Sequence, residues 1–188
     1  RIRHGGFTQA MRARTFALTV ALIAPQTVFP ETLELIGVHG WMTKSVIGVS
    51  GIEMRSDGMG FAAIGDQGWV FEGELQRDGA VISDVQITRM AGIIGSDGLP
   101  VSARIVGDWS DAEGLAMTED GRAWISFERW AHVWQYDDIF GEANWIKDHE
   151  TFYEFSENRQ LEAVAVTRDG TVYAFSEQPL KDGFPIYR

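Results

Sequence analysis

Three observations predict that this chain is all-β. Three Asp-Gly pairs, at positions 57, 120 and 169, can be aligned with one another, each between two short apolar-rich runs. The runs on either side of these pairs are rich in residues that favour strands. No long segment shows the 3.6-residue spacing of apolar residues that an amphipathic helix requires. Because Asp and Gly tolerate the positive φ angles of a tight turn, each Asp-Gly pair with its two flanking runs indicates a β-hairpin.

The expected elements follow in chain order. The hairpin turns are Asp57-Gly58, Asp120-Gly121 and Asp169-Gly170. The strands before the turns are Ser50–Met54, Glu113–Met117 and Glu162–Val166, and those after them are Gly60–Ile64, Ala123–Phe127 and Thr171–Phe175. Further strands are expected at Trp69–Leu75, Val81–Arg89 and His132–Tyr136.

The spacing of the turns favours a repeat architecture. They lie 63 and 49 residues apart, which suits four-stranded blades with loop insertions. We therefore expect a β-propeller with about three blades, and a sandwich of hairpins is the alternative. A ring typically needs about 4–8 blades, and the last residues, Phe184–Arg188, resemble the middle of a hairpin. The sequence is accordingly expected to be a C-terminally truncated fragment.

The first thirty residues differ from the rest of the chain. The basic stretch Met11–Arg14 precedes the apolar run Thr15–Ala24, a pattern typical of a signal peptide, and Met11 is the expected start. The run is shorter than the roughly 20 residues that a membrane-spanning helix needs. We expect residues 1–30 to be a signal peptide with upstream residues, residues 31–188 to form the domain, and the protein to be periplasmic or secreted.

The charge of the chain limits its partners. With 16 basic and 27 acidic side chains overall, and four arginines but no acid in residues 1–30, residues 31–188 have a formal net charge of −15. Such a charge repels nucleic acid and anionic membranes and favours cations. Because the chain has no cysteine, disulfides and thiolate metal sites are excluded, and oxygen atoms become the expected metal ligands.

Acidic residues recur at matched places around the Asp-Gly turns. Glu113 precedes Glu128 by 15 residues, and Glu162 precedes Glu177 by the same 15. In the first hairpin Ser50 takes the leading place and Asp66 follows one residue late, a shift that a bulge or a longer turn would absorb.

These acids are expected to lie at the strand ends away from the turns and to converge from neighbouring blades. Converging carboxylates repel one another unless a cation or protons neutralise them. Calcium, which accepts 6–8 oxygen ligands in flexible geometry, is the expected metal, and solvated or backbone-capping glutamates are the alternative.

Several stretches together resemble a known family. They are Val49–Glu53, Ile64–Gly68, Asp111–Ala116, Trp124–Glu128 and Leu161–Ala165 with Asn158. Their order and spacing are similar to those of the phytase-like propeller family called esterase-like activity of phytase, from roughly Leu33 to the end. The pair Arg159-Gln160 departs from the family, which usually has a glycine-containing turn there. The resemblance implies ester or phosphoester hydrolysis and matches acids at Asp66, Asp111, Glu113, Glu128, Glu162 and Glu177.

Two functions remain open at this stage. The first is a metal-dependent hydrolase of phosphate or carboxylate esters acting on a small anionic or ester substrate. In that case Glu113, Glu162 and Asp111 would be metal ligands, and the general base would be Glu128, Asp66 or Glu177. The alternative is a non-catalytic, calcium-stabilised binding propeller, and whether the protein is an enzyme stays open.

Motifs of several common hydrolase and nucleotide-binding classes are absent from the sequence. The sequence has no G-x-S-x-G elbow, Walker loop or G-x-G-x-x-G motif, so those hydrolase and nucleotide-binding classes are not indicated. Arg129 is expected to pair with Glu128 or to meet an anionic substrate. Four tryptophans are expected either to line a substrate cleft or to pack between blades; they are Trp124, Trp130, Trp134 and Trp145.

Overall fold

The computed structural model describes residues 35–41, 46, 48–103, 110–156 and 159–188. The chain divides into two units, Arg1–Glu34 and Leu35–Arg188, and every described residue belongs to the second. The expected signal peptide and Asn158 lie outside the described residues. Within the described part, no helix has the length and apolar character needed to cross a membrane.

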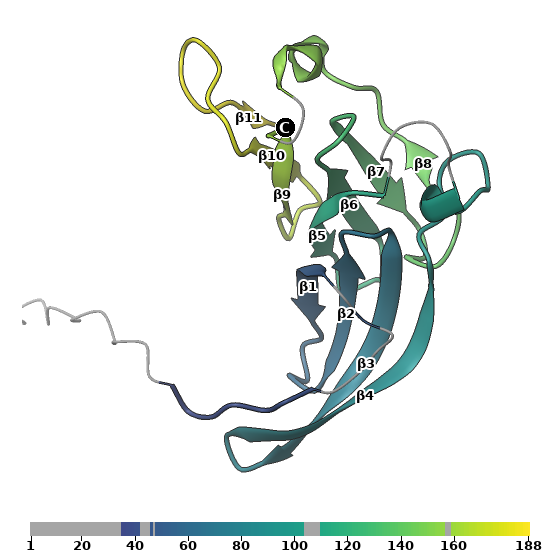
Figure 1. Ribbon diagram of the computed structural model, residues 1–188, viewed down its shortest axis with the longest axis vertical. Helices are drawn as coiled ribbons and strands as arrows, with labels where there is room; N and C mark the ends of the chain where they lie inside the picture. Colours follow the sequence, from purple (N-terminus) through teal and green to yellow (C-terminus); the bar gives the residue numbers. More distant parts are fainter. Residues whose placement is uncertain (1–34, 42–45, 47, 104–109, 157–158) are drawn as a thin grey trace, which may run out of the picture. The chain divides into compact units, whose positions relative to one another are not determined.

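The described residues form three antiparallel sheets, each with its strands in chain order and none closed on itself (Figure 1). The first contains β1 (Val49–Met54), β2 (Gly60–Gly65), β3 (Trp69–Asp78) and β4 (Val81–Gly92). The second contains β5 (Ala112–Met117), β6 (Ala123–Phe127), β7 (His132–Tyr136) and β8 (Asn144–Trp145). The third contains β9 (Leu161–Val166), β10 (Val172–Ser176) and β11 (Ile186–Tyr187).

The all-β prediction is confirmed, and each expected strand is present. The only helical segments among the described residues are two short 3-10 turns, η1 (Val101–Ala103) and η2 (Glu150–Glu154). The sequence did not indicate β8, because its two residues are too few to show an alternating pattern, whereas β11 lies within Phe184–Arg188, the segment that resembled the middle of a hairpin.

The Asp-Gly turns explain the hairpins. Gly58, Gly121 and Gly170 all have positive φ angles, which glycine adopts without the steric cost of a Cβ atom. The second and third turns are alike: the amide of Thr118 donates to the carbonyl of Arg122 at 2.9 Å, and that of Thr167 donates to the carbonyl of Thr171 at 2.8 Å. The first turn spans one residue more, with the amide of Arg55 donating to the carbonyl of Gly60 at 2.8 Å.

The second sheet shares a buried core with each of the other two. Ile64 and Val70 of the first sheet pack in one cluster with Ile125 and Trp134 of the second. A separate cluster joins Trp124 and Val133 of the second sheet to residues of the third, namely Leu161, Val164 and Ala174. The first strands also meet directly, since β5 contacts both β1 and β9. Packing between neighbouring sheets thus places β1, β5 and β9 side by side (Figure 1).

Two glycines set the spacing of these first strands. A Cβ atom at Gly51 would lie 2.9 Å from the Leu115 backbone nitrogen, and one at Gly114 would lie 2.6 Å from that of Val164. Such approaches are too close for any side chain, so glycine is required at both positions. Each glycine follows the residue at which its strand bulges, so the closest contact between strands is at the end that carries the acids.

Candidate metal centre

A β-bulge at the same place in each sheet positions the leading residues of the acidic pairs. The pairing register shifts between Val49 and Gly51, between Ala112 and Gly114, and between Leu161 and Ala163. The bulged residues are therefore Ser50, Glu113 and Glu162. A bulge bends the strand and turns the extra side chain out of the regular alternation. Bulging is thus common to all three sheets and does not explain the late position of Asp66, which comes from the longer first turn.

The trailing acids also occupy one structural position. The backbone amides of Asp66, Glu128 and Glu177 each donate a hydrogen bond of 2.9 Å to the chain just before the bulge. The accepting carbonyls belong to Gly48, Asp111 and Gln160 respectively. Asp66 therefore occupies the same structural position as Glu128 and Glu177, and its one-residue offset in the sequence comes from the extra residue in the first hairpin turn.

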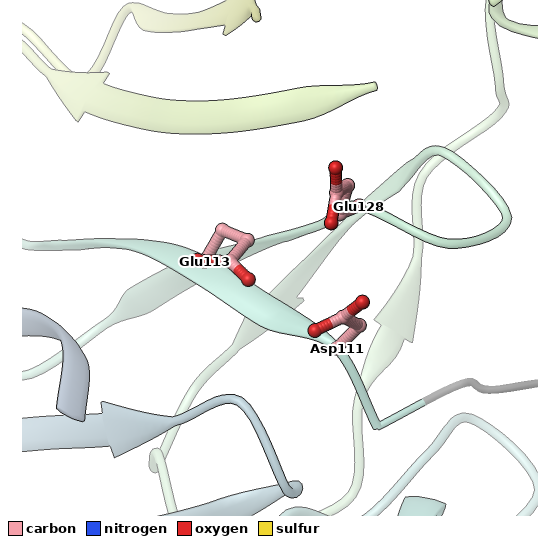
Figure 2. A group of neighbouring side chains, drawn as sticks. All are labelled: Asp111, Glu113 and Glu128. Carbon is pink, nitrogen blue, oxygen red and sulfur yellow. The ribbon is translucent and has the colours of Figure 1, made fainter. Parts of the chain in front are cut away.

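Five of the six predicted acids form two overlapping groups. Asp111, Glu113 and Glu128 place one carboxylate oxygen each within 4.8 Å of one another, and so do Glu128, Glu162 and Glu177. Figure 2 shows the first group, with Asp111 just before β5, Glu113 near the start of that strand, and Glu128 just beyond the end of β6. Glu128 belongs to both groups and is buried, with 8% of its surface exposed.

Burial and mutual repulsion disfavour the ionised forms of these acids. Burial raises the pKa of Glu113 to about 8, and the charges of Asp111 and Glu162 add to the effect. Burial likewise raises the pKa of Glu128 to about 7, with further contributions from Asp111 and Glu162. The pKa values of Asp111 and Glu162 are raised as well, again mainly by burial. Such a cluster binds either protons or a cation, because only these relieve the repulsion.

Asp66 lies beside the groups rather than in them. Its charge raises the pKa of Asp111, so the two carboxylates are neighbours. Its Oδ1 is shielded from solvent and has no hydrogen-bond partner in the described part of the chain. Gly48, with a φ of 64°, makes room for it, since a Cβ atom there would lie 2.0 Å from that oxygen. In the first sheet Ser50 replaces the leading acid and donates to the carbonyl of Ala112, joining β1 to β5.

The remaining buried polar side chains support this end of the sheets. Among described residues the buried polar or charged side chains are Ser126, Glu128, His132 and Gln160. Ser126 accepts a 3.0 Å hydrogen bond from the amide of Gly114, directly beside the bulge at Glu113. Gln160 accepts from the amide of Ala131, and the Nδ1–H of His132 donates to the carbonyl of Trp130. Buried polar groups are thus concentrated around the acids.

The turn between β6 and β7 carries an unusual backbone angle. Trp130 has a φ of 59°, the only positive φ of a non-glycine residue in the described part of the chain. In the corresponding turn of the first sheet, Gly68 takes a positive φ instead. A bulky residue in this region is strained by roughly 1–3 kcal/mol and persists only where its surroundings fix it. The hydrogen bonds of His132 and Gln160 on either side of Trp130 provide that fixation.

Some roles differ from the sequence-based expectations. Arg129 forms an ion pair with Asp111 at 3.4 Å, an acid that the sequence did not single out as its partner. Gln160, part of a predicted departure from the family pattern, joins the second sheet to the third through Ala131. Sequence reasoning missed Ser126 and Gly48; comparing the residues that flank the bulges in the three repeats would have singled out both.

The four tryptophans have separate surroundings. Trp134 is buried in the core between the first and second sheets, and Trp124 is buried between the second and third. Trp130 and Trp145 are exposed. The expectation of packing between sheets is therefore confirmed for Trp124 and Trp134.

Comparison with known proteins places this arrangement in a family. The family model described as "Phytase-like: Esterase-like activity of phytase" matches residues 44–185, most of the chain. The chain belongs to this family. No curated protein matches it.

The match spans all three sheets of this phytase-like domain up to the loop before β11. It includes both acidic groups and Asp66, together with the residues that support them. The resemblance expected from the sequence is thereby confirmed, and the acids lie within the part of the chain that defines the family.

Proposed function

We propose that this phytase-like domain is a calcium-dependent hydrolase of phosphate or carboxylate esters. The observation that carries the proposal is the position of Glu128, one buried carboxylate shared by two groups of three acids. A protein gains little from burying acids that repel one another, so such an arrangement favours a cation between them.

The donor set fits calcium. The two groups supply only carboxylate oxygens, which are hard ligands suited to calcium rather than to softer metals. We assign Asp111, Glu113, Glu162 and Glu177 as ligands, and Glu128 as the ligand that both groups share. Carbonyl oxygens and waters would complete a coordination number of 6–8. Magnesium is less suited, because it demands near-octahedral geometry.

The base is the carboxylate that the metal does not need. Asp66 lies outside both groups but next to Asp111. A bound cation would polarise the ester oxygen and make a bound water more acidic. Asp66 would accept the proton of that water, and its partnerless Oδ1 leaves it without a competing hydrogen bond among described residues at that oxygen. This assignment moves Glu128 and Glu177 from base candidates to ligands.

We further propose that the three sheets are blades of a β-propeller. Each sheet is an antiparallel meander, and the first strands lie side by side with their acids at the same end. In a propeller the first strand of each blade lines the central channel, which is where a cation held by several blades would sit. A crystal structure with β1, β5 and β9 around one axis would support this, and a stacked sandwich would refute it.

Two variants test the hydrolase proposal. The chain should hydrolyse phytate or a simple ester such as p-nitrophenyl phosphate with calcium present and lose the activity with EDTA. Asp66→Asn should lower kcat by at least about a hundredfold while leaving calcium affinity unchanged, because general-base catalysis contributes about 10²–10⁴-fold. Glu128→Gln should weaken calcium binding itself. Equal activity of Asp66→Asn and the unaltered protein would rule out this base.

The alternative is a calcium-stabilised binding domain without catalysis. The observation in its favour is that the acids lie where the first strands meet, so a cation there would also hold the sheets together. Calcium would then raise the melting temperature of the Asp66→Asn variant and of the unaltered protein equally, and neither would hydrolyse any ester.

Export to the periplasm or secretion remains part of the proposal. It is supported by the basic start and short apolar run of residues 1–30. Cell fractionation should find the protein outside the cytoplasm, with residues before the domain removed. Replacing two leucines of the run, Leu18 and Leu22, with arginine should retain it in the cytoplasm.

A further inference from the structure

A second candidate site lies between the second and third sheets. A cleft of about 900 Å³ is lined by residues of β6, β7 and β8 on one side and of β10 and β11 on the other, together with η2 and the segment before it. None of the six acids described above lines it. Its volume is in the range typical of small-molecule sites.

Aromatic rings with exposed faces line this cleft. Trp145 is 54% exposed and Tyr153 is 78% exposed, although both are large enough to stabilise a core if buried. Exposed aromatic faces of this kind stack on apolar ring faces of a ligand, while the polar edge of the ring remains free to hydrogen-bond.

The part of the cleft formed by β11, η2 and His149 is held in place by specific contacts. The Tyr187 hydroxyl and Thr151 Oγ1 share a hydrogen bond of 2.8 Å, which joins β11 to η2. The Phe152 ring packs edge-on against Tyr187 at 4.7 Å, and the His149 ring lies 5.3 Å from it. A wall fixed in this way loses little conformational freedom when a ligand binds.

Asp148, which lines the cleft, has a carboxylate oxygen without a hydrogen-bond donor among the described residues. Its Oδ1 is shielded from solvent and has no hydrogen-bond partner in the part of the chain that the structure describes. Burial raises the pKa of Asp148. Oδ1 has therefore lost water without gaining a protein donor, and the carboxylate is less well solvated than an exposed one. A ligand hydroxyl that donates to the other oxygen, Oδ2, would stabilise this carboxylate more than it would stabilise a fully solvated one.

The charges around the cleft favour an uncharged ligand. Two basic side chains, Lys147 and Arg188, and two acidic ones, Asp148 and Glu150, line it, so their formal charges cancel. Both donors and acceptors are thus available next to aromatic faces. A ligand with a ring, several hydroxyl groups and no net charge uses all of them.

We propose that this cleft binds a neutral carbohydrate, with sugar rings stacked on Trp145 and Tyr153 and hydroxyl groups donating to Asp148. The site is separate from the acidic groups, and carbohydrate binding there requires neither calcium nor ester hydrolysis. An organic cation would also stack on these rings, but the four charged side chains of the cleft cancel and leave no net negative charge to attract it.

Isothermal titration of the full chain with cellohexaose, maltohexaose and N-acetylchitohexaose tests the proposal, with EDTA present. At least one oligosaccharide should bind. Trp145→Ala and Tyr153→Ala should each weaken that binding by about tenfold, the effect of losing roughly 1.4 kcal/mol of stacking. Both side chains are exposed, so folding should survive, as circular dichroism would verify. Asp148→Asn should also weaken binding.

The matched control is Trp130→Ala, which removes an equally exposed tryptophan that does not line the cleft. It should bind the oligosaccharide as tightly as the unaltered chain. The proposal is overturned if none of the three sugars binds, if Trp145→Ala and Tyr153→Ala both bind normally, or if tetramethylammonium binds in their place.

Discussion

The side-chain oxygen of Gln160 accepts a hydrogen bond from the backbone amide of Ala131, 29 residues earlier in the chain. Ala131 ends the turn after Glu128, and Gln160 precedes Glu162 by two residues. A single amide side chain therefore fixes the acidic end of the second sheet relative to that of the third.

Removing this link should destabilise the domain. Gln160→Ala leaves the buried amide of Ala131 without an acceptor, which typically costs about 1–3 kcal/mol. Chemical denaturation should show this loss, together with weaker calcium binding. Gln67→Ala, an exposed position in the corresponding turn of the first sheet, is the control and should change neither. Equal stability of both variants would mean that the link contributes nothing.

Glu113→Gln tests the proposed calcium site. The change keeps the shape of the side chain but removes a charge from a group of repelling acids. The calcium-free melting temperature should stay the same or rise, and most of the increase caused by millimolar calcium should disappear. That increase corresponds to about 2.7 kcal/mol at a hundredfold excess over Kd.

Glu142→Gln, at an exposed acid outside both groups, should behave like the unaltered protein. If Glu113→Gln lowers the melting temperature equally with and without calcium, Glu113 is a structural hydrogen-bonding residue and not a ligand.

Stability without calcium should fall as the pH rises. In the folded state the pKa values are about 8 for Glu113 and about 7 for Glu128, against an ordinary value of 4.5. Between these values the folded state binds more protons than the unfolded state. The stability is therefore fully present below about pH 4.5 and is lost as the pH rises through 7 and 8.

Melting curves in EDTA from pH 5 to pH 9 measure this dependence. The Glu113→Gln variant should show a shallower decline, which separates the contribution of Glu113 from those of other groups. Calcium should oppose the decline, because it competes with protons for the same carboxylates. A melting temperature that is constant or increases with pH in EDTA contradicts the electrostatic description.

The backbone at Trp130 predicts a difference between two small replacements. Trp130→Gly and Trp130→Ala both remove the exposed indole, but only glycine adopts a φ of 59° without strain. The glycine variant should therefore be more stable than the alanine variant by about 1 kcal/mol, as measured by urea denaturation. An alanine variant of equal or greater stability would show that the turn is not strained.

Much of the fold could be predicted from the sequence because its signals are local. Asp57-Gly58, Asp120-Gly121 and Asp169-Gly170 determine turn geometry on their own, and strand patterns beside them determine the hairpins. The equal spacing of Glu113–Glu128 and Glu162–Glu177 then predicted that these acids share a position, which the matching bulges explain.

Other parts of the site depend on contacts between distant residues. That Gln160 joins Ala131, or that Gly114 lies against Val164, follows from how one sheet packs on the next. Asp66 shows the same limit. Its sequence position is one residue later than those of Glu128 and Glu177 because the first hairpin turn is one residue longer, and only the strand register shows the length of that turn. The cleft beside Trp145 is formed by five strands and η2, so no single stretch of sequence indicates it.

The close contact between Gly48 and the Asp66 carboxylate makes the number of acids differ between the sheets. At position 48 a side chain would occupy the space of the Asp66 carboxylate, whereas the corresponding place in the second sheet carries Asp111. The first sheet therefore contributes one acid, and the second contributes three. Under the proposed function, an anionic ester would meet fewer carboxylates on the side of the first sheet, where Ser50 stands at the place of a leading acid.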